Sequence, residues 1–203
     1  MTDGGTEMTA VGHVLLVVDC QRDFCEGGSL PVEGGAEVAH AIADFIARHG
    51  EEYTAIIATR DWHVDPVDHF SAHPDYRNTW PVHCVAGTVG AEFAPGLDDR
   101  GPFVGLLTAQ VSKGGTEAAY SGFEGLTDDG RSLRELLAAI GAQRIDIVGL
   151  TTDYCVRFTA LDSVADGYDT SVLLPLTAAV AAETKADAVT AMEKAGVRVL
   201  QTL

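Results

Sequence analysis

Four of the seven histidines in the chain fall between positions 63 and 83. Three of them follow an aspartate in the pattern Asp-x-His-x5-His-x13-His, which comprises Asp61, His63, His69 and His83. Imidazole is the commonest protein ligand for transition metals, and this set of one carboxylate and three imidazoles suits zinc, iron(II) or manganese(II). The pattern therefore predicts one divalent metal site. The alternative is a polar loop without a metal, and His73, which lies off the pattern, is interpreted as a solvated loop residue.

A carboxylate, Asp19, directly follows the apolar run from Val14 to Val18. If that run is a buried strand, the carboxylate lies at the carboxyl end of the strand, where solvation is poor. Buried carboxylates at such positions cluster at catalytic sites, although a loop cap would occupy the same place. Asp19 is thus a candidate general acid or base.

Cys155 lies where a predicted strand ends, at 145–150, and a segment with helical spacing begins. A thiol in the first turn of a helix meets unpaired N–H groups and the positive end of the helix dipole, which lower its pKa. Thr152 or Asp153 is expected to cap this helix. The sequence therefore predicts a nucleophile, and the alternative is a buried cysteine that packs as a small apolar side chain.

Lys113 follows a weaker predicted strand at 109–112 and precedes Gly114 and Gly115, which let the backbone approach a ligand closely. Alone it would be a solvated surface charge. Together with Asp19 and Cys155, it lies at the end of one of three different strands, and such ends can converge on one crevice. The other cysteines, Cys20, Cys25 and Cys84, are scattered without a CxxC motif and are expected to be packing residues without disulfides.

The elements that would position these residues alternate along the chain. Apolar runs predict buried strands at 13–18, 53–58, 145–150, 170–174 and 197–200, besides the weaker one at 109–112. Helical spacing recurs at 38–46, 133–140, 156–164 and 188–192, and glycines follow several of these segments: Gly50, Gly141, Gly167 and Gly196. This alternation predicts an open α/β sheet of parallel strands with helices on both faces. The long segment from Asp61 to about Gly130 predicts functional loops.

Composition restricts the class of protein. The chain has 203 residues, a length that favours one domain over 1–203, with 1–12 as an N-terminal extension. Its formal net charge is −17, so nucleic acid is a poor partner. There is no apolar run long enough to cross a membrane and no secretory signal, which predicts a cytoplasmic protein without membrane contact. Whether the chain forms homo-oligomers is left open.

Several motifs resemble a known family. Residues 17–30, 59–63, 68–71, 80–84, 113–114, 120–123 and 149–156 resemble, in order, the nicotinamidase/pyrazinamidase branch of the isochorismatase-like cysteine hydrolases. The resemblance covers essentially all of positions 13 to 200. Departures are mild: Arg60 stands where many relatives have lysine, and Thr151 where alanine or glycine is frequent.

This resemblance implies a six-stranded parallel sheet and hydrolysis of nicotinamide to nicotinate and ammonia, a step in NAD salvage, with pyrazinamide as a further substrate. It implies that Cys155 is the nucleophile, that Asp19 transfers the proton, and that Lys113 favours the charged forms of its neighbours. Further implied roles are an oxyanion hole at the N–H groups of Thr151 and Cys155 and a cis Leu150–Thr151 peptide. The resemblance also assigns the metal to Asp61, His63, His69 and His83, and substrate contacts to Phe24, Trp80 and Tyr120.

Three other classes of protein are alternatives to this assignment, and their catalytic or metal-binding motifs differ from those of this chain. Relatives similar to N-carbamoylsarcosine amidohydrolase share the catalytic triad, here Asp19, Lys113 and Cys155, but generally lack the Asp-x-His motif. They remain the second candidate. Isochorismatase itself lacks the nucleophilic cysteine and the histidine cluster. A non-catalytic protein on this fold is expected to have lost one of Asp19, Lys113 or Cys155, and all three are present.

Overall fold

The computed structural model describes residues 12–98 and 101–203. Within them lies one sheet of six parallel strands, as the sequence and the resemblance predicted, and its strand order is β3-β2-β1-β4-β5-β6. The strands are β1 (Gly12–Val18), β2 (Ala55–His63), β3 (Leu107–Gly115), β4 (Ala142–Leu150), β5 (Asp169–Ala178) and β6 (Arg198–Leu200). The predicted N-terminal extension lies outside the described residues, except for Gly12, which is the first residue of β1.

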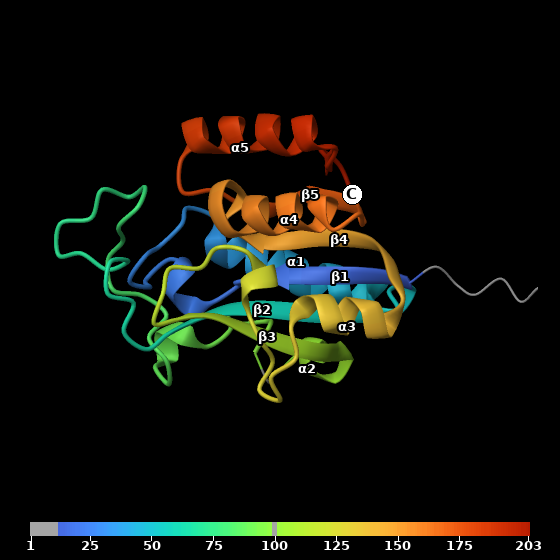
Figure 1. The fold of residues 1–203 in the computed structure, drawn as a ribbon, viewed down its shortest axis with the longest axis horizontal. Coiled ribbons are helices and arrows are strands. Elements are labelled where there is room, and N and C mark those ends of the chain that lie inside the picture. Colours follow the sequence, from blue (N-terminus) through green and yellow to red (C-terminus); the bar gives the residue numbers. More distant parts are fainter. Residues whose placement is uncertain (1–11, 99–100) are drawn as a thin grey trace, which may run out of the picture.

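Helices cover both faces of the sheet (Figure 1). One face packs against α1 (Gly35–His49) and α2 (Pro102–Leu106), and the other against α3 (Leu133–Ile140), α4 (Arg157–Ala165) and α5 (Ala182–Ala195). The central strand β1 is buried from both sides, since Val14 to Val18 are all 0% exposed. A strand that buries both faces reads as a continuous apolar run, which explains why β1 was predictable.

The helix ends follow the predicted glycines with one exception. Gly141 after α3 and Gly196 after α5 have φ values of 70° and 98°, in the left-handed region that glycine adopts without strain. Gly50 after α1 has a φ of −58° and begins a 3-10 turn instead. A Cβ there would lie 3.0 Å from a methyl of Leu106, so Gly50 serves the close approach of α1 and α2 rather than a left-handed cap.

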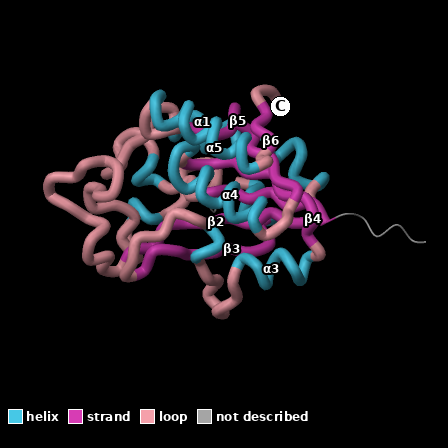
Figure 2. The backbone as a smooth tube through the Cα atoms, turned by 45° about the horizontal axis from the view of Figure 1, so that its top comes forward, coloured by secondary structure: helices cyan, strands magenta, loops and turns pink. Residues whose placement is uncertain are grey.

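The long loops gather beyond the carboxyl ends of the strands, at one end of the molecule (Figure 2). The segment between β2 and β3 carries most of them, and its described residues include one 3-10 turn, Val89–Ala91, and α2. β3 itself is longer than predicted, because it is an edge strand in which only Val111 and Lys113 are buried, so it lacks a long apolar run. Among the described residues, no helix is long and apolar enough to cross a membrane.

Candidate active site

Asp19 and Cys155 lie at the point where the strand order reverses. The chain adds β2 and β3 on one side of β1 and then crosses to β4 on the other side. Asp19 follows β1, and Cys155 follows β4 in a π-helical turn, Thr152–Val156, that leads into α4. In open α/β sheets, ligands bind in the crevice at such a reversal. The structure therefore brings two of the three predicted catalytic residues to the expected place.

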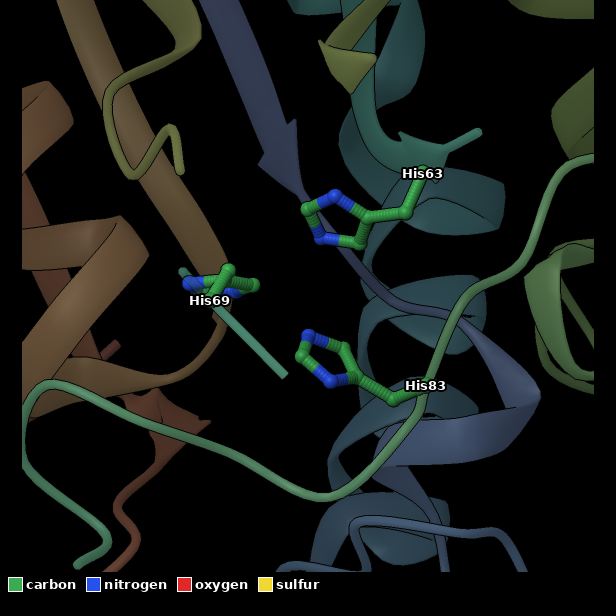
Figure 3. A group of neighbouring side chains, drawn as sticks. All are labelled: His63, His69 and His83. Carbon is green, nitrogen blue, oxygen red and sulfur yellow. The ribbon is translucent and has the colours of Figure 1, made fainter. Parts of the chain in front are cut away.

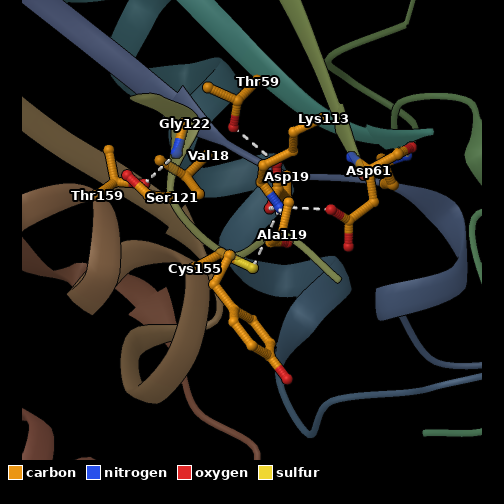
Figure 4. A network of polar contacts seen from close by, with 12 residues as sticks. Val18, Asp19, Thr59, Asp61, Lys113, Ala119, Ser121, Gly122, Cys155 and Thr159 are labelled. Atoms are coloured by element: carbon orange, nitrogen blue, oxygen red, sulfur yellow. Dashed lines mark hydrogen bonds and ion pairs between the residues drawn. The ribbon is translucent and has the colours of Figure 1, made fainter. Parts of the chain in front are cut away.

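Lys113 connects the groups of this crevice (Figure 4). Its Nζ lies 2.8 Å from Asp19 Oδ2, donates to Cys155 Sγ at 3.5 Å, and also donates to Asp61 Oδ1 and the carbonyl oxygen of Ala119. Burial alone would lower the pKa of Lys113, but the two carboxylates outweigh it and raise this pKa well above its usual value. The lysine is thus a fixed positive charge beside the thiol.

Asp19 is held in one orientation. It has a φ of 46°, which turns the chain sharply at the end of β1, and its Oδ1 accepts a hydrogen bond of 2.6 Å from the Thr59 hydroxyl. Its side chain is fully buried, and this burial raises the pKa of Asp19 even though Lys113 acts to lower it. A carboxylate with a raised pKa accepts a proton more readily, as a general base must.

The electrostatics of Cys155 differ from the prediction. The sequence predicted that a helix start would lower the pKa of the thiol, but burial raises it well above the usual value, and Lys113 counteracts this only in part. The turn around Cys155 is wound as a π-helix inside the protein, and the carboxylates of Asp19 and Asp61 add to the effect of burial on the thiol pKa. The thiol consequently needs a neighbouring base, and its Sγ lies within 4.8 Å of carboxylate oxygens of Asp19 and Asp61.

The peptide bond before this turn is cis, between Leu150 and Thr151, as the resemblance implied. Thr151 accepts from the backbone N–H groups of Tyr154 and Val156 through its carbonyl oxygen, at 3.2 and 3.0 Å. Thr151 and Cys155 both line the same pocket, which agrees with the oxyanion hole that the resemblance implies. That role is a proposal.

Next to the triad, three histidines face a common space (Figure 3). Ligand nitrogens of His63, His69 and His83 lie within 4.8 Å of one another, and all three side chains are buried. Asp61 joins them, because its Oδ2 lies 3.7 Å from Nε2 of both His63 and His83. The four predicted ligands are therefore adjacent. His73 is exposed, as predicted.

These residues fit a divalent metal. Both ring nitrogens of His63 and Nδ1 of His69 are buried without a hydrogen-bond partner, an arrangement that is costly unless a cation binds there. His83 Nδ1 lies 2.8 Å from the carbonyl oxygen of Pro81, which fixes the tautomer with a free Nε2. Burial and the two neighbouring imidazoles lower the pKa of His69 to about 4, so this ring is neutral, as a metal ligand must be.

Gly114 is required beside the histidines. A Cβ at this position would lie 2.6 Å from the His63 ring, and Gly114 has a φ of 97°. The sequence predicted that glycine here would let the backbone approach a ligand, and the close approach is instead to the side chain of His63. β2 and β3 pair in register so that Asp61 lies opposite Lys113, which explains how one carboxylate serves both groups.

Sequence reasoning missed Gln21, which positions Asp61. The Gln21 side chain is fully buried; its Oε1 accepts from the Asp61 N–H at 2.8 Å, and its Nε2 donates to the Asp61 carbonyl oxygen at 2.8 Å. Nε2 also donates to the Ala91 carbonyl oxygen at 2.9 Å. The amide thus pairs with the backbone of β2 as a neighbouring strand would. The signal was present, because Gln21 lies inside the motif at 17–30, but an amide alone suggests no chemistry.

One pocket joins the two groups of polar residues. The predicted substrate contacts Phe24, Trp80 and Tyr120 all line it, and the Trp80 indole N–H donates to the Tyr120 hydroxyl at 3.0 Å. Four further lining residues, which are apolar or aromatic, were not predicted from the sequence: Leu30, Val32, Tyr154 and Val180. A flat aromatic amide is the kind of molecule that such walls accommodate.

His69→Ala is expected to remove most of the bound metal, because it deletes one of four adjacent ligands and leaves the others unable to complete the site. The measurement is elemental analysis of the purified protein after dialysis, alongside circular dichroism. His73→Ala is the matched control, since His73 is exposed and lies in the same loop. Equal metal content in His69→Ala and the unsubstituted protein would show that the ligands are wrongly assigned.

The open parallel sheet, with buried polar residues at its switch point and a pocket beside them, defines an α/β protein with a site of the kind that enzymes have. The chain belongs to the isochorismatase family: the model of the isochorismatase domain matches residues 13–202.

Individual relatives indicate which members of this family the chain is similar to. Over 188 residues the chain is 47% identical to the nicotinamidase/pyrazinamidase of Mycobacterium tuberculosis, a match that covers 93% of this chain and 98% of that protein. Among solved structures, the pyrazinamidase of Pyrococcus horikoshii in complex with zinc is similar, with a TM-score of 0.76, 36% identity and coverage of 94% and 99% of the two chains. The L. infantum protein PnC1 in complex with nicotinate has a TM-score of 0.77, 34% identity and coverage of 94% and 92%.

Proposed function

We propose that this protein is a nicotinamidase that hydrolyses nicotinamide to nicotinate and ammonia, and that it also accepts pyrazinamide. The observation that carries the proposal is that one pocket is lined both by Cys155, which lies beside Asp19 and Lys113, and by Asp61, His69 and His83 of the histidine cluster. The relatives support it, because the M. tuberculosis protein carries both activities in its name and the L. infantum protein binds nicotinate. The reaction belongs to NAD salvage, and we propose that it takes place in the cytoplasm.

Cys155 begins the reaction as a thiol. Asp19 takes the Sγ proton, and the thiolate attacks the amide carbonyl carbon to form a tetrahedral adduct. The positive charge of Lys113, 3.5 Å from Sγ, stabilises the thiolate while it forms. Asp19 then passes the proton to the departing ammonia, which leaves an acyl thioester on Cys155.

The same groups complete the cycle. Asp19 is again a carboxylate after ammonia leaves, so it can take a proton from the water that attacks the thioester. The carbonyl oxygen becomes negatively charged in both tetrahedral adducts, and the N–H groups of Thr151 and Cys155 are proposed to stabilise it. Collapse of the second adduct releases nicotinate and the Cys155 thiolate, and Asp19 returns its proton to Sγ, which restores the thiol.

We propose that Asp61, His63, His69 and His83 hold one divalent ion, which is zinc, iron(II) or manganese(II). When bound, such an ion offers an open position to a ligand such as a ring nitrogen. Phe24 and Trp80 orient the aromatic ring against this cluster, so that the amide faces Cys155. Because misplacement by about 1 Å can lower a rate about a hundredfold, this orientation matters for catalysis.

Benzamide is expected to be a poor substrate, because it has the same amide and nearly the same shape as nicotinamide but no ring nitrogen. Its kcat/KM should be at least about a hundredfold lower, a difference of roughly 2.7 kcal/mol in transition-state stabilisation. Ammonia release over nicotinamide, pyrazinamide and benzamide measures this and tests the proposed function itself. Equal turnover of benzamide and nicotinamide would mean that the histidine cluster does not select the substrate.

A further inference from the structure

Asp153 is a buried carboxylate, two residues before Cys155, that the mechanism above does not use. Its side chain is 1% exposed. The sequence predicted it as a cap for the helix that follows Cys155, but neither the π-helical turn nor α4 has a side-chain cap. Asp153 instead reaches a different helix: its Oδ1 accepts from Val180 N–H at 3.1 Å, and its Oδ2 accepts from Ala181 N–H at 3.3 Å and from the Thr184 hydroxyl.

These contacts join the two sides of the substrate pocket. The turn Thr152–Val156 carries Cys155, and the loop that leads from β5 into α5 carries Val180, whose side chain lines the pocket. This loop lies at the same end of the molecule as the long loops that follow the other strands (Figure 1). A second contact supports the first, because the Thr152 hydroxyl donates to the Thr177 hydroxyl at 2.8 Å near the end of β5.

The position of the Val180 loop depends on Asp153 in particular. Val180 is half-buried and Ala181 is exposed, so water could satisfy their N–H groups if the carboxylate were absent. The loop could then move outward at little cost in hydrogen bonding. With Asp153 present, three donors converge on one buried carboxylate and set the separation between Val180 and the nucleophile.

We propose that Asp153 is a positioning residue, which acts through Val180 and fixes the part of the pocket wall that Val180 forms, so that the pocket keeps a width suited to an aromatic ring. Its effect on substrate binding rests on the proposed function, whereas its effect on access to Cys155 does not. Asp153 touches neither the proposed substrate nor the reacting atoms. Its removal should therefore weaken substrate binding more than it slows the chemistry.

The test compares three variants with the unsubstituted enzyme in its metal-loaded form. Asp153→Ala should raise KM for nicotinamide about tenfold while kcat falls less than about threefold. Asp153→Asn keeps an acceptor and should restore part of the loss. Thr184→Val deletes one donor only, and should shift KM in the same direction by a smaller factor even if Asp153→Ala fails to fold.

Alkylation of Cys155 by iodoacetamide, followed by mass spectrometry, gives a readout that needs no substrate. A looser wall should make alkylation several times faster in Asp153→Ala and measurably faster in Thr184→Val. Ser132→Ala is the matched control, because Ser132 caps α3 far from the pocket by accepting from Glu135 N–H. It should lower thermal stability and leave KM and the alkylation rate unchanged.

Two results would overturn the inference. One is a lowered melting temperature in the Asp153 and Thr184 variants, as in Ser132→Ala, with unchanged KM and alkylation rate. The other is a fall in kcat with KM unchanged, which would assign Asp153 to the chemical step. If the unsubstituted protein does not hydrolyse nicotinamide but the variants alkylate faster, the proposed function is wrong and the role of Asp153 stands.

Discussion

Cys155→Ala should abolish ammonia release from nicotinamide while the fold and the metal content stay intact. The substitution removes the only atom that forms a covalent bond to the substrate in the proposed mechanism, and nothing else in the pocket offers a nucleophile of comparable strength. The structural cost is small, because truncating the buried Cys155 to alanine leaves a small cavity that costs about 1–2 kcal/mol of stability. We therefore expect activity below about one thousandth of the starting value.

The other three cysteines make this prediction specific. Burial raises the pKa of every thiol in the chain, to about 11 for Cys25 and well above the usual value for Cys20, Cys84 and Cys155. Burial therefore cannot explain why one of them would react. Only Cys155 accepts a hydrogen bond from a charged lysine with a buried aspartate beside it.

Cys25→Ala is the control, since the Cys25 thiol donates only to the Gln21 carbonyl oxygen and lies outside the triad. It should retain most of the activity. Mass spectrometry of enzyme quenched during turnover should locate the acyl group on Cys155 alone. More than a trace of activity in Cys155→Ala, or an acyl group on another residue, would exclude this nucleophile.

The sequence predicted correctly those helices and strands whose apolar spacing and end residues mark the whole element. α3 was predicted at 133–140 and lies there, because a capping box at Ser132 and Glu135 begins it and Gly141 ends it. β3 was predicted at 109–112 but spans Leu107–Gly115, since an edge strand with exposed polar positions has no continuous apolar run. Boundaries also failed in strands inside the sheet: β2 was predicted at 53–58 and spans Ala55–His63, and β5 was predicted at 170–174 and spans Asp169–Ala178. Both strands continue past the point where polar or exposed residues interrupt their apolar runs.

Some features of the site could likewise be predicted from the sequence and others could not. Asp19, Lys113 and the histidine cluster could be predicted, because charged residues at the ends of apolar strands are unusual and the topology forces those ends together. The partner of Asp153 could not, since its hydrogen bonds cross to a helix 27 to 31 residues further along the chain. The pKa of Cys155 was predicted in the wrong direction because local sequence describes the helix start and not the burial around it.

Asp19→Asn should lower kcat/KM for nicotinamide by about a thousandfold or more, because it removes the group that takes the thiol proton. Asparagine is the appropriate replacement for two reasons. It tolerates the left-handed φ of 46° at this position better than alanine, and its Oδ1 can still accept from the Thr59 hydroxyl.

The loss should come from chemistry rather than from unfolding. Breaking a buried ion pair leaves an uncompensated charge and can cost about 3–5 kcal/mol, but Lys113 keeps its second carboxylate partner, Asp61, so the charge remains paired. Circular dichroism and metal analysis should therefore match those of the unsubstituted protein. Thr59→Val is the control: it deletes one donor to Asp19 and leaves the carboxylate beside Lys113, so its loss should be about tenfold or less.

Single-turnover measurements separate the two roles proposed for Asp19. If Asp19 both removes the thiol proton and activates the water, Asp19→Asn should slow formation of the acyl enzyme and also its hydrolysis, with the pH dependence of both steps altered. A defect in acylation alone would assign the water to another base. Retention of more than about a tenth of kcat/KM would mean that Cys155 loses its proton by another route, since a general base is worth about a hundredfold at the least.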